Sequence, residues 1–148
     1  MSNLNTLPSD QATLVATIDP DAYAAGAVTS DWVPMATYVG GIQAIVMAGT
    51  LGTSATLDGK LQQATDSSGT GAADITGKAI TQLTEAGTDS DKQAIINCRP
   101  EELTDGFTHV ALVMTVGTAT SDAGGLILGH GARYQPATDL ASVDEVVS

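Results

Sequence analysis

Aromatic residues are scarce in this chain of 148 residues, which holds one Phe, one Trp and three Tyr. An aromatic side chain buries roughly 150–250 Å², so the core has to be filled with Val, Ile, Leu, Ala and Met instead. Such a core predicts a thin sandwich that benefits from packing against neighbouring subunits. Cysteine is scarcer still, and the single Cys98 excludes an internal disulfide framework.

Basic residues are also few: five Lys and Arg stand against 17 Asp and Glu, which gives a formal net charge of −12. The five bases are spread along the chain, whereas binding to nucleic acid phosphates needs clustered bases. We therefore expect no nucleic acid partner. The acids stand singly or in spaced pairs, a pattern typical of a solvated surface.

Long apolar runs are absent from the sequence. No stretch approaches the roughly 18 residues of a membrane-spanning helix, and the first residues lack the basic start and apolar run of a signal peptide. We expect a soluble protein that is synthesised in the cytoplasm and has no membrane partner.

Signatures of nucleotide and metal binding are missing as well. The glycine-rich segments 49–53 and 69–71 lack the Gly-Lys-Ser/Thr ending of a phosphate-binding loop and precede no predicted helix, so they are interpreted as turns. The Asp-x-Asp pairs at 19–21 and 89–91 resemble fragments of a calcium loop without its remaining ligands. No cofactor and no metal ligand are predicted.

The sequence offers little for acid–base or nucleophilic catalysis. His109 and His130 are the only histidines, so a metal site would have to recruit both of them together with a carboxylate. A nucleophile would need Cys98 or a serine beside one of them, and no Gly-x-Ser-x-Gly motif is present. We predict no catalytic residue and no enzymatic activity. The enzyme alternative requires a pocket in which His109 or His130 meets Cys98 or a carboxylate.

Strand-forming residues are what the sequence does contain, most clearly over 42–66. Residues 42–48 are apolar at nearly every position, which predicts a strand covered on both faces. Residues 55–62 alternate between apolar and polar side chains, the pattern of a half-buried strand. Gly49, Gly52 and the residues between them are typical of a turn, so the two strands are predicted to form a β-hairpin.

Further short strands and loops are predicted along the chain. The strands are at 31–38, 75–83, 93–98, 107–116 and 126–128, with polar loops at 66–74 and 85–92, a helical turn at 99–103 and a chain reversal at 117–125. Short strands separated by turn residues favour an all-β fold, an antiparallel β-sandwich, over alternating strands and helices. The pattern leaves the strand order open between a jelly roll and an immunoglobulin-like sandwich.

Three regions are predicted. Residues 1–30 form an extended N-terminal arm, residues 31–137 the β-sandwich domain and residues 138–148 a C-terminal tail. Prolines interrupt the arm, in which only a short strand around Leu14 and Val15 is expected. The arm is either partly disordered or ordered by packing on a neighbouring subunit. The tail carries apolar residues at helical spacing, which leaves a short docking helix and a frayed end as alternatives.

Four segments combine sheet and turn residues in a familiar way. They are ATLDGKLQQATDSSGTG (residues 55–71), DITGKAITQLT (74–84), GFTHVALVMTVGTATS (106–121) and GARYQPA (131–137). Together they resemble small virion structural proteins of tailed bacteriophages. The resemblance implies an auxiliary head protein, a decoration or cement protein that binds the outside of the capsid and stabilises it.

The partners implied by this resemblance are the major capsid protein and further copies of the chain itself, and the implied location is the exterior of the virion capsid. An acidic protein with few bases suits that outer face better than a surface in contact with packaged DNA. The candidate subunit contacts are apolar or aromatic residues and the rare cations: Leu14, Val15, Trp32, Tyr38, Arg99, Arg133 and Tyr134.

Two other functions stay open. One is a different phage particle component, namely a head–tail connector, a tail tube subunit or a tail-tip module, which differs from a decoration protein in its copy number per particle. The other is a glycan- or receptor-binding β-sandwich, which would use Trp32, Tyr38 and Tyr134 as its exposed aromatic residues.

Overall fold

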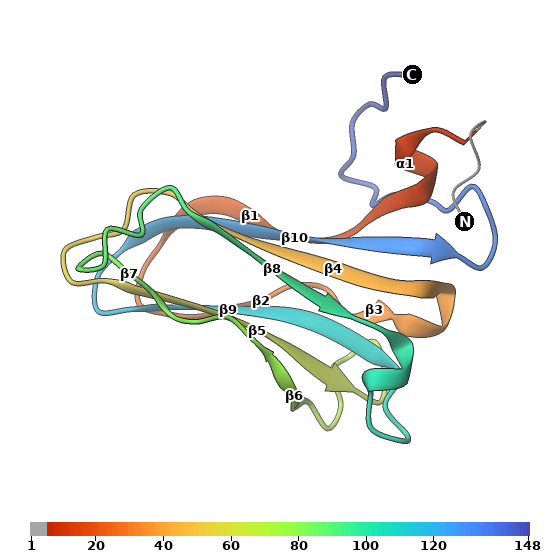
Figure 1. The fold of residues 1–148 in the computed structure, drawn as a ribbon, viewed down its shortest axis with the longest axis horizontal. Helices are drawn as coiled ribbons and strands as arrows, with labels where there is room; N and C mark the ends of the chain where they lie inside the picture. The colour runs from red at the N-terminus through yellow and green to blue at the C-terminus, as the bar shows by residue number, and fades with distance from the viewer. Residues whose placement is uncertain (1–5) are drawn as a thin grey trace.

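The computed structural model describes residues 6–148, which fold into two antiparallel β-sheets packed face to face (Figure 1). Sheet A contains, in order across the sheet, β1 (Ala12–Tyr23), β10 (Ser121–Ala132), β4 (Tyr38–Ala48) and β8 (Gln93–Cys98). Sheet B contains β2 (Gly26–Thr29), β9 (His109–Gly117), β5 (Thr56–Ala64) and β6 (Ala73–Ala79), with β3 (Val33–Pro34) beside β9 and β7 (Leu83–Thr84) beside β5. The predicted all-β antiparallel sandwich is confirmed.

Helical structure within the described residues is limited to single turns: α1 (Pro8–Gln11) and the 3-10 turns η1 (Met35–Thr37) and η2 (Pro100–Glu102). The turn η2 lies within the segment where a helical turn is predicted, and the Arg99 N–H donates to Glu102 Oε2 at 2.8 Å to hold it. No helix among the described residues is both long and apolar enough to cross a membrane.

The strands pair in a nested pattern. β1 pairs with β10, β2 with β9, β4 with β8, and β5 with β6, so the chain is a long antiparallel ribbon folded over on itself. Two further pairings, β10 with β4 and β9 with β5, join the strands of the folded ribbon into two separate sheets. This strand order is that of a jelly roll. Of the two sandwiches left open by the sequence, the structure therefore has the jelly roll.

The predicted β-hairpin over 42–66 is wrong, because its two strands, β4 and β5, lie in different sheets. β4 already has neighbours on both sides, β10 and β8, and so has no free edge for β5. The connection instead crosses between the sheets along the start of β10. There the Gly49 N–H donates to the Asp122 carbonyl at 2.7 Å, and the Asp122 N–H donates to the Thr50 carbonyl at 3.0 Å. Leu51, in the middle of the crossing, is buried.

The segment predicted as an N-terminal arm is built into the sandwich. Its first five residues lie outside the described part of the chain, and the remainder forms α1, β1 and β2, so that it contributes a strand to each sheet. Pro20 was one of the prolines that suggested an irregular arm. It falls between Ile18 and Asp21, where the register of β1 against β10 shifts, so the missing N–H of Pro20 interrupts no regular pairing.

The core between the sheets is aliphatic, as the scarcity of aromatic residues predicts. Leu57, Leu61, Leu112, Met114 and Ile127 are among its fully buried side chains. They come from the inner faces of β5, β9 and β10, whose alternate residues point into the sandwich.

The last strand is longer than predicted, because two of its glycines serve packing rather than turns. β10 begins at Ser121, inside the predicted chain reversal. A Cβ at Gly129 would lie 2.5 Å from Tyr38 Cδ1, so only glycine lets the buried tyrosine ring lie against this strand. A Cβ at Gly124 would lie 3.0 Å from Pro20 Cα, so this glycine lets the shifted part of β1 pass close to β10.

The C-terminal tail forms no helix. Figure 1 shows it turning back past the start of β1, close to α1. The Leu140 N–H donates to the Leu14 carbonyl at 3.0 Å, and the Leu14 N–H donates to Asp139 Oδ1 at 2.9 Å. The helical spacing of the apolar residues in the tail therefore does not determine its structure, whereas the hydrogen bonds to the edge of β1 fix its position.

Candidate interaction surface

The outward-facing residues of sheet A form an apolar surface, which we call the outer face of sheet A. The strand registers place Thr17, Leu126, Ile45 and Ile95 in one row across all four strands, and Leu14, Leu128, Gln43 and Asn97 in the next row. Met47 lies two residues along β4 from Ile45 and so on the same side of the sheet.

These apolar side chains are not covered by the rest of the described chain. Met47 is 46% exposed and Ile95 is 57% exposed, whereas their neighbours Val46 and Ile96, which point inward, are buried. Ile45, Leu126 and Leu128 are partly exposed. Neighbouring apolar residues on a surface are a feature of interaction sites, unlike single exposed ones.

The outer face of sheet B is polar by contrast. There Lys60 forms an ion pair with Asp74 at 2.9 Å, and Gln62 Nε2 donates to Asp74 Oδ1 at 2.7 Å. The hydrogen bond from Gln62, followed by the one from Lys60, holds the pKa of the Asp74 carboxyl below its ordinary value. Gln82 Nε2 donates to Asp58 Oδ2 at 2.7 Å on the same sheet. The two outer faces thus differ in chemistry: the outer face of sheet A is apolar and suited to burial against a partner, whereas the outer face of sheet B is polar.

A groove of about 710 Å³ lies on sheet A beside the shifted half of β1. Its lining comes from β1, the end of β4 and the start of β10, and includes Met47, Leu126, Gly124 and Gly125. The groove is therefore open, mostly apolar and continuous with the outer face of sheet A through Met47 and Leu126.

Carboxylates line the groove. Asp19, Asp21 and Asp122 belong to its lining and are exposed, and no Lys or Arg is among the described residues that line it. Beside it, the Tyr23 hydroxyl donates to the Asp19 carbonyl. Burial, and then the negative charges of Asp21 and Asp19, raise the pKa of Tyr23. The groove thus combines apolar walls with negative charge, which favours an apolar group flanked by cations.

The predicted contact residues on β1 lie at the edge of sheet A. Leu14 belongs to the outer face of sheet A and pairs with Leu128. Val15 falls at the register shift between Leu14 and Ala16 and packs partly against the core. Of the two, Leu14 is therefore the one whose side chain belongs to the apolar surface.

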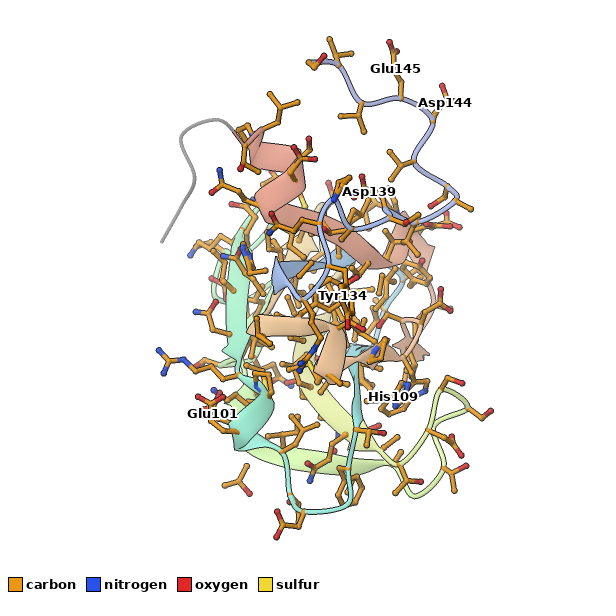
Figure 2. The ribbon with its side chains drawn as sticks, turned by 90° about the vertical axis from the view of Figure 1, so that its right-hand side faces the viewer. Glu101, His109, Tyr134, Asp139, Asp144 and Glu145 are labelled. Atoms are coloured by element: carbon orange, nitrogen blue, oxygen red, sulfur yellow. The ribbon has the colours of Figure 1, made fainter. Side chains whose placement is uncertain are left out.

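Three other predicted contacts follow β8 or β10, which both run antiparallel to β4 and therefore end at the same end of the sandwich. Tyr134 is 81% exposed and lies over the middle of this end in Figure 2, below Asp139 of the tail. Arg133 is exposed and its Nε donates to the Ala36 carbonyl at 3.1 Å. Arg99 follows the end of β8, and its side chain is 75% exposed. All three of these side chains are therefore accessible.

The remaining two predicted contacts are covered by the chain itself. Tyr38 is buried in the core against Gly129, so its expected role as a surface contact is corrected: its ring fills the end of the sandwich. Trp32 is half-buried, and a Cβ at Gly69 would lie 2.6 Å from its Nε1, so the indole packs against the 66–71 loop.

The outer face of sheet A is the feature that sequence reasoning missed. Ile45 and Met47 lie inside the run 42–48, where apolar residues at every position indicate a strand covered on both faces. Leu126 and Leu128 alternate with the buried Ile127. The sequence shows these apolar residues at alternate positions of strands. It does not show whether another part of the chain covers them.

Cys98, His109 and His130 share no hydrogen bond with one another. Burial, and then the negative charge of Glu102, raise the pKa of Cys98 to about 11, so its thiol stays protonated at neutral pH. His109 is in sheet B with Nδ1 2.8 Å from Thr108 Oγ1, and His130 is in sheet A with Nε2 3.4 Å from Gln43 Oε1. Among the described residues, no group of three or more His, Cys, Asp or Glu could hold a metal ion.

Comparison with known proteins gives no family for this chain: no protein-family model matches it, and no curated protein matches it either.

Proposed function

We propose that this chain is a virion structural protein that decorates the head of a tailed bacteriophage and binds the outside of its shell through the outer face of sheet A. The observation that carries this proposal is the difference between the two outer faces. Ile45, Met47 and Leu126 leave sheet A apolar, whereas Lys60 and Asp74 make sheet B polar. A protein that sits on a shell needs one face to be covered and one to meet water.

The fold and the charge support the same role. Jelly rolls recur in viral capsid proteins and also in lectins, so the fold agrees with a particle protein by analogy without selecting it. The net charge of −12 suits a surface turned away from packaged DNA. The acidic groove with Asp19, Asp21 and Asp122 in its lining would accept a cationic, partly apolar segment of the shell.

Binding of this kind stabilises the assembled particle. A protein that binds the assembled shell and not its dissociated subunits shifts the equilibrium toward the shell by mass action. The stabilisation grows with the occupancy of sites, so it is largest for a protein present in many copies over the head.

The aromatic residues favour this role over the glycan-binding alternative. Tyr38 is buried and Trp32 is half-covered, which leaves Tyr134 as the freely exposed member of the three. A sugar-stacking platform needs an accessible ring with polar neighbours, and the outer face of sheet A offers aliphatic side chains in its place.

The test uses heads assembled without this protein, to which the purified protein is added back. The wild-type protein is expected to bind in many copies and to raise the resistance of the heads to heat and osmotic shock. Met47→Lys, which places a charge on the outer face of sheet A, is expected to lower the number of bound copies at least tenfold. Thr29→Lys on sheet B, an exposed position with the same change in charge, is the matched control and binds like the wild type.

Three results would contradict the proposal. Heads without the protein that resist heat and shock as well as complete heads would exclude a cementing role. A few copies at one vertex, or stacked rings in a tail, would favour the connector or tube alternatives. Equal binding by Met47→Lys and Thr29→Lys would exclude the outer face of sheet A as the contact.

A further inference from the structure

The edges of the two sheets differ in how they are protected. The edge of β1 is covered by the tail at Leu14 and interrupted by Pro20. β2 has only 4 residues and begins with a glycine. β6 is irregular, with a register shift against β5, a left-handed backbone at Gly77 and the charged Lys78. Short, irregular, charged or covered edges are the devices by which proteins avoid pairing with other chains.

The edge strand β8 carries none of these devices. Its 6 residues, Gln93–Cys98, contain no proline, glycine or charged residue. Its register against β4 runs without a shift from Cys98 opposite Ile42 to Gln93 opposite Met47. It also holds Ile95, one of the most exposed large apolar residues of the described chain. A regular, uncharged and partly apolar edge is a template for strand addition.

The ladder with β4 determines which backbone groups of β8 are free. The Ala48 N–H donates to the Lys92 carbonyl at 2.9 Å, so this pair is a hydrogen-bonded one. Hydrogen-bonded and non-bonded pairs alternate along an antiparallel ladder, which directs the N–H and C=O groups of Gln93, Ile95 and Asn97 away from β4. Within residues 6–148, no strand pairs with β8 on that side.

We propose that β8 pairs with β8 of a second copy of this chain, antiparallel and related by a two-fold axis at Ile95. In this register Ile95 lies opposite Ile95 of the partner subunit, and Gln93 lies opposite Asn97 of the partner subunit. The charged residues that flank the strand then also match, because Asp91 comes close to Arg99 of the partner subunit at both ends.

The side chains select a second copy and this register. Ile95 gains an apolar neighbour in place of water, and the amides of Gln93 and Asn97 can bond one another. Arg99 is available, because its side chain is 75% exposed and its contact with Glu101 is a long 3.9 Å. A shift of two residues in either direction would place Ile95 opposite an amide side chain and would no longer place Asp91 opposite Arg99.

The dimer would join two copies of sheet A edge to edge. The row that holds Leu126, Ile45 and Ile95 would then continue into the partner, which doubles the apolar surface offered to a shell. The inference deepens the proposed function, since it names the contact between copies. It is tested on the isolated protein, so its failure leaves binding of single copies to heads untouched.

The experiment measures the molar mass of the purified protein in solution by sedimentation equilibrium, over a range of concentration and salt. The wild-type protein is expected to dimerise, and more tightly as salt screens its negative charge. Ile95→Lys is expected to raise the dissociation constant of the dimer at least tenfold. Met47→Lys changes the same face by the same charge but leaves the edge intact, and as the matched control it retains the dimer.

Amide hydrogen exchange of the wild-type protein provides a second readout that does not depend on the folding of a variant. The amides of Gln93, Ile95 and Asn97 are expected to exchange more slowly as protein concentration rises. The amides of Ala94, Ile96 and Cys98, which face β4, are expected not to change with concentration. A wild-type protein that stays monomeric at high salt, a dimer that survives Ile95→Lys, or equal loss with Met47→Lys would each overturn the pairing.

Discussion

The crossing between β4 and β5 can be tested by a single substitution, Leu51→Ala. Leu51 is 4% exposed and packs against the hydrophobic core at the point where the chain passes from sheet A to sheet B. In a β-hairpin the same residue would lie at the tip of an exposed loop. The free energy of unfolding of the variant therefore distinguishes the jelly roll from the hairpin arrangement.

The magnitude follows from the burial of this side chain. Replacing a buried leucine by alanine costs about 2–5 kcal/mol, and the cost is smaller where the surroundings can close around the gap. Leu51 lies in a connection at the end of the core, so we expect a loss of about 2–3 kcal/mol. For a chain of this length, each kcal/mol lowers the melting temperature by about 2–4 °C, which predicts a decrease of roughly 4–12 °C.

Urea unfolding followed by circular dichroism is the suitable assay, because it gives the free energy together with the slope of its dependence on denaturant. The midpoint is expected to fall while the slope stays unchanged, since both proteins expose the same surface on unfolding. Thr53→Ala, in the same connection but exposed, is the matched control and should stay within about 0.5 kcal/mol of the wild type. Equal stability of Leu51→Ala and Thr53→Ala would refute the buried crossing.

Two further outcomes are expected. The pKa of Cys98 is raised to about 11 from 9.0, so the folded state holds the thiol proton more tightly than the unfolded state. The contribution of this proton to the free energy of unfolding is complete below pH 9 and declines as pH rises from about 9 to 11. Urea unfolding across this range should therefore show a smaller decline in stability for Cys98→Ala than for the wild type. Gly129→Ala should destabilise the protein by about 1–3 kcal/mol, because the added methyl group overlaps the Tyr38 ring. In a double-mutant cycle, adding Tyr38→Leu should recover part of this loss. Additive effects of the two substitutions would show that the two residues do not interact.

Most strands could be predicted from the sequence, because alternation and β-branched residues are local signals. β5, β8 and β9 lie close to where the pattern of apolar residues places them. The outward positions of β5, including Asp58 and Lys60, are polar as predicted. The scarcity of aromatic residues correctly indicates an aliphatic core, since that conclusion depends on composition alone.

The partners of the strands could not be predicted in the same way. Adjacent strands often pair, and that tendency suggested a hairpin between β4 and β5. In the structure the partner of β4 on one side is β10, which lies at the other end of the sequence. No local pattern encodes such a contact. The predicted chain reversal at 117–125 failed for a related reason: Gly124 is required by the close approach of Pro20, which is distant in sequence.

The candidate site depended on the same kind of information. Arg99, Arg133 and Tyr134 were predicted from residue type, and the structure places all three on the surface at one end of the sandwich. Tyr38 was predicted on the same grounds and is buried. Residue type alone does not separate the two cases, because an aromatic side chain suits both an interface and a core.

The run 42–48 connects the sequence to the proposed assembly. Its apolar residues occur on both sides of the strand, a pattern that belongs to strands covered on both faces. Sheet B covers the side that carries Ala44 and Val46, which are buried. The other side carries Ile45 and Met47, over which no strand of the described chain lies. A chain that needed only to fold alone would gain solubility from polar residues at these two positions, as β5 does at Asp58 and Lys60. The apolar residues on the outer side of β4 are therefore the basis of our proposal that another chain covers this face.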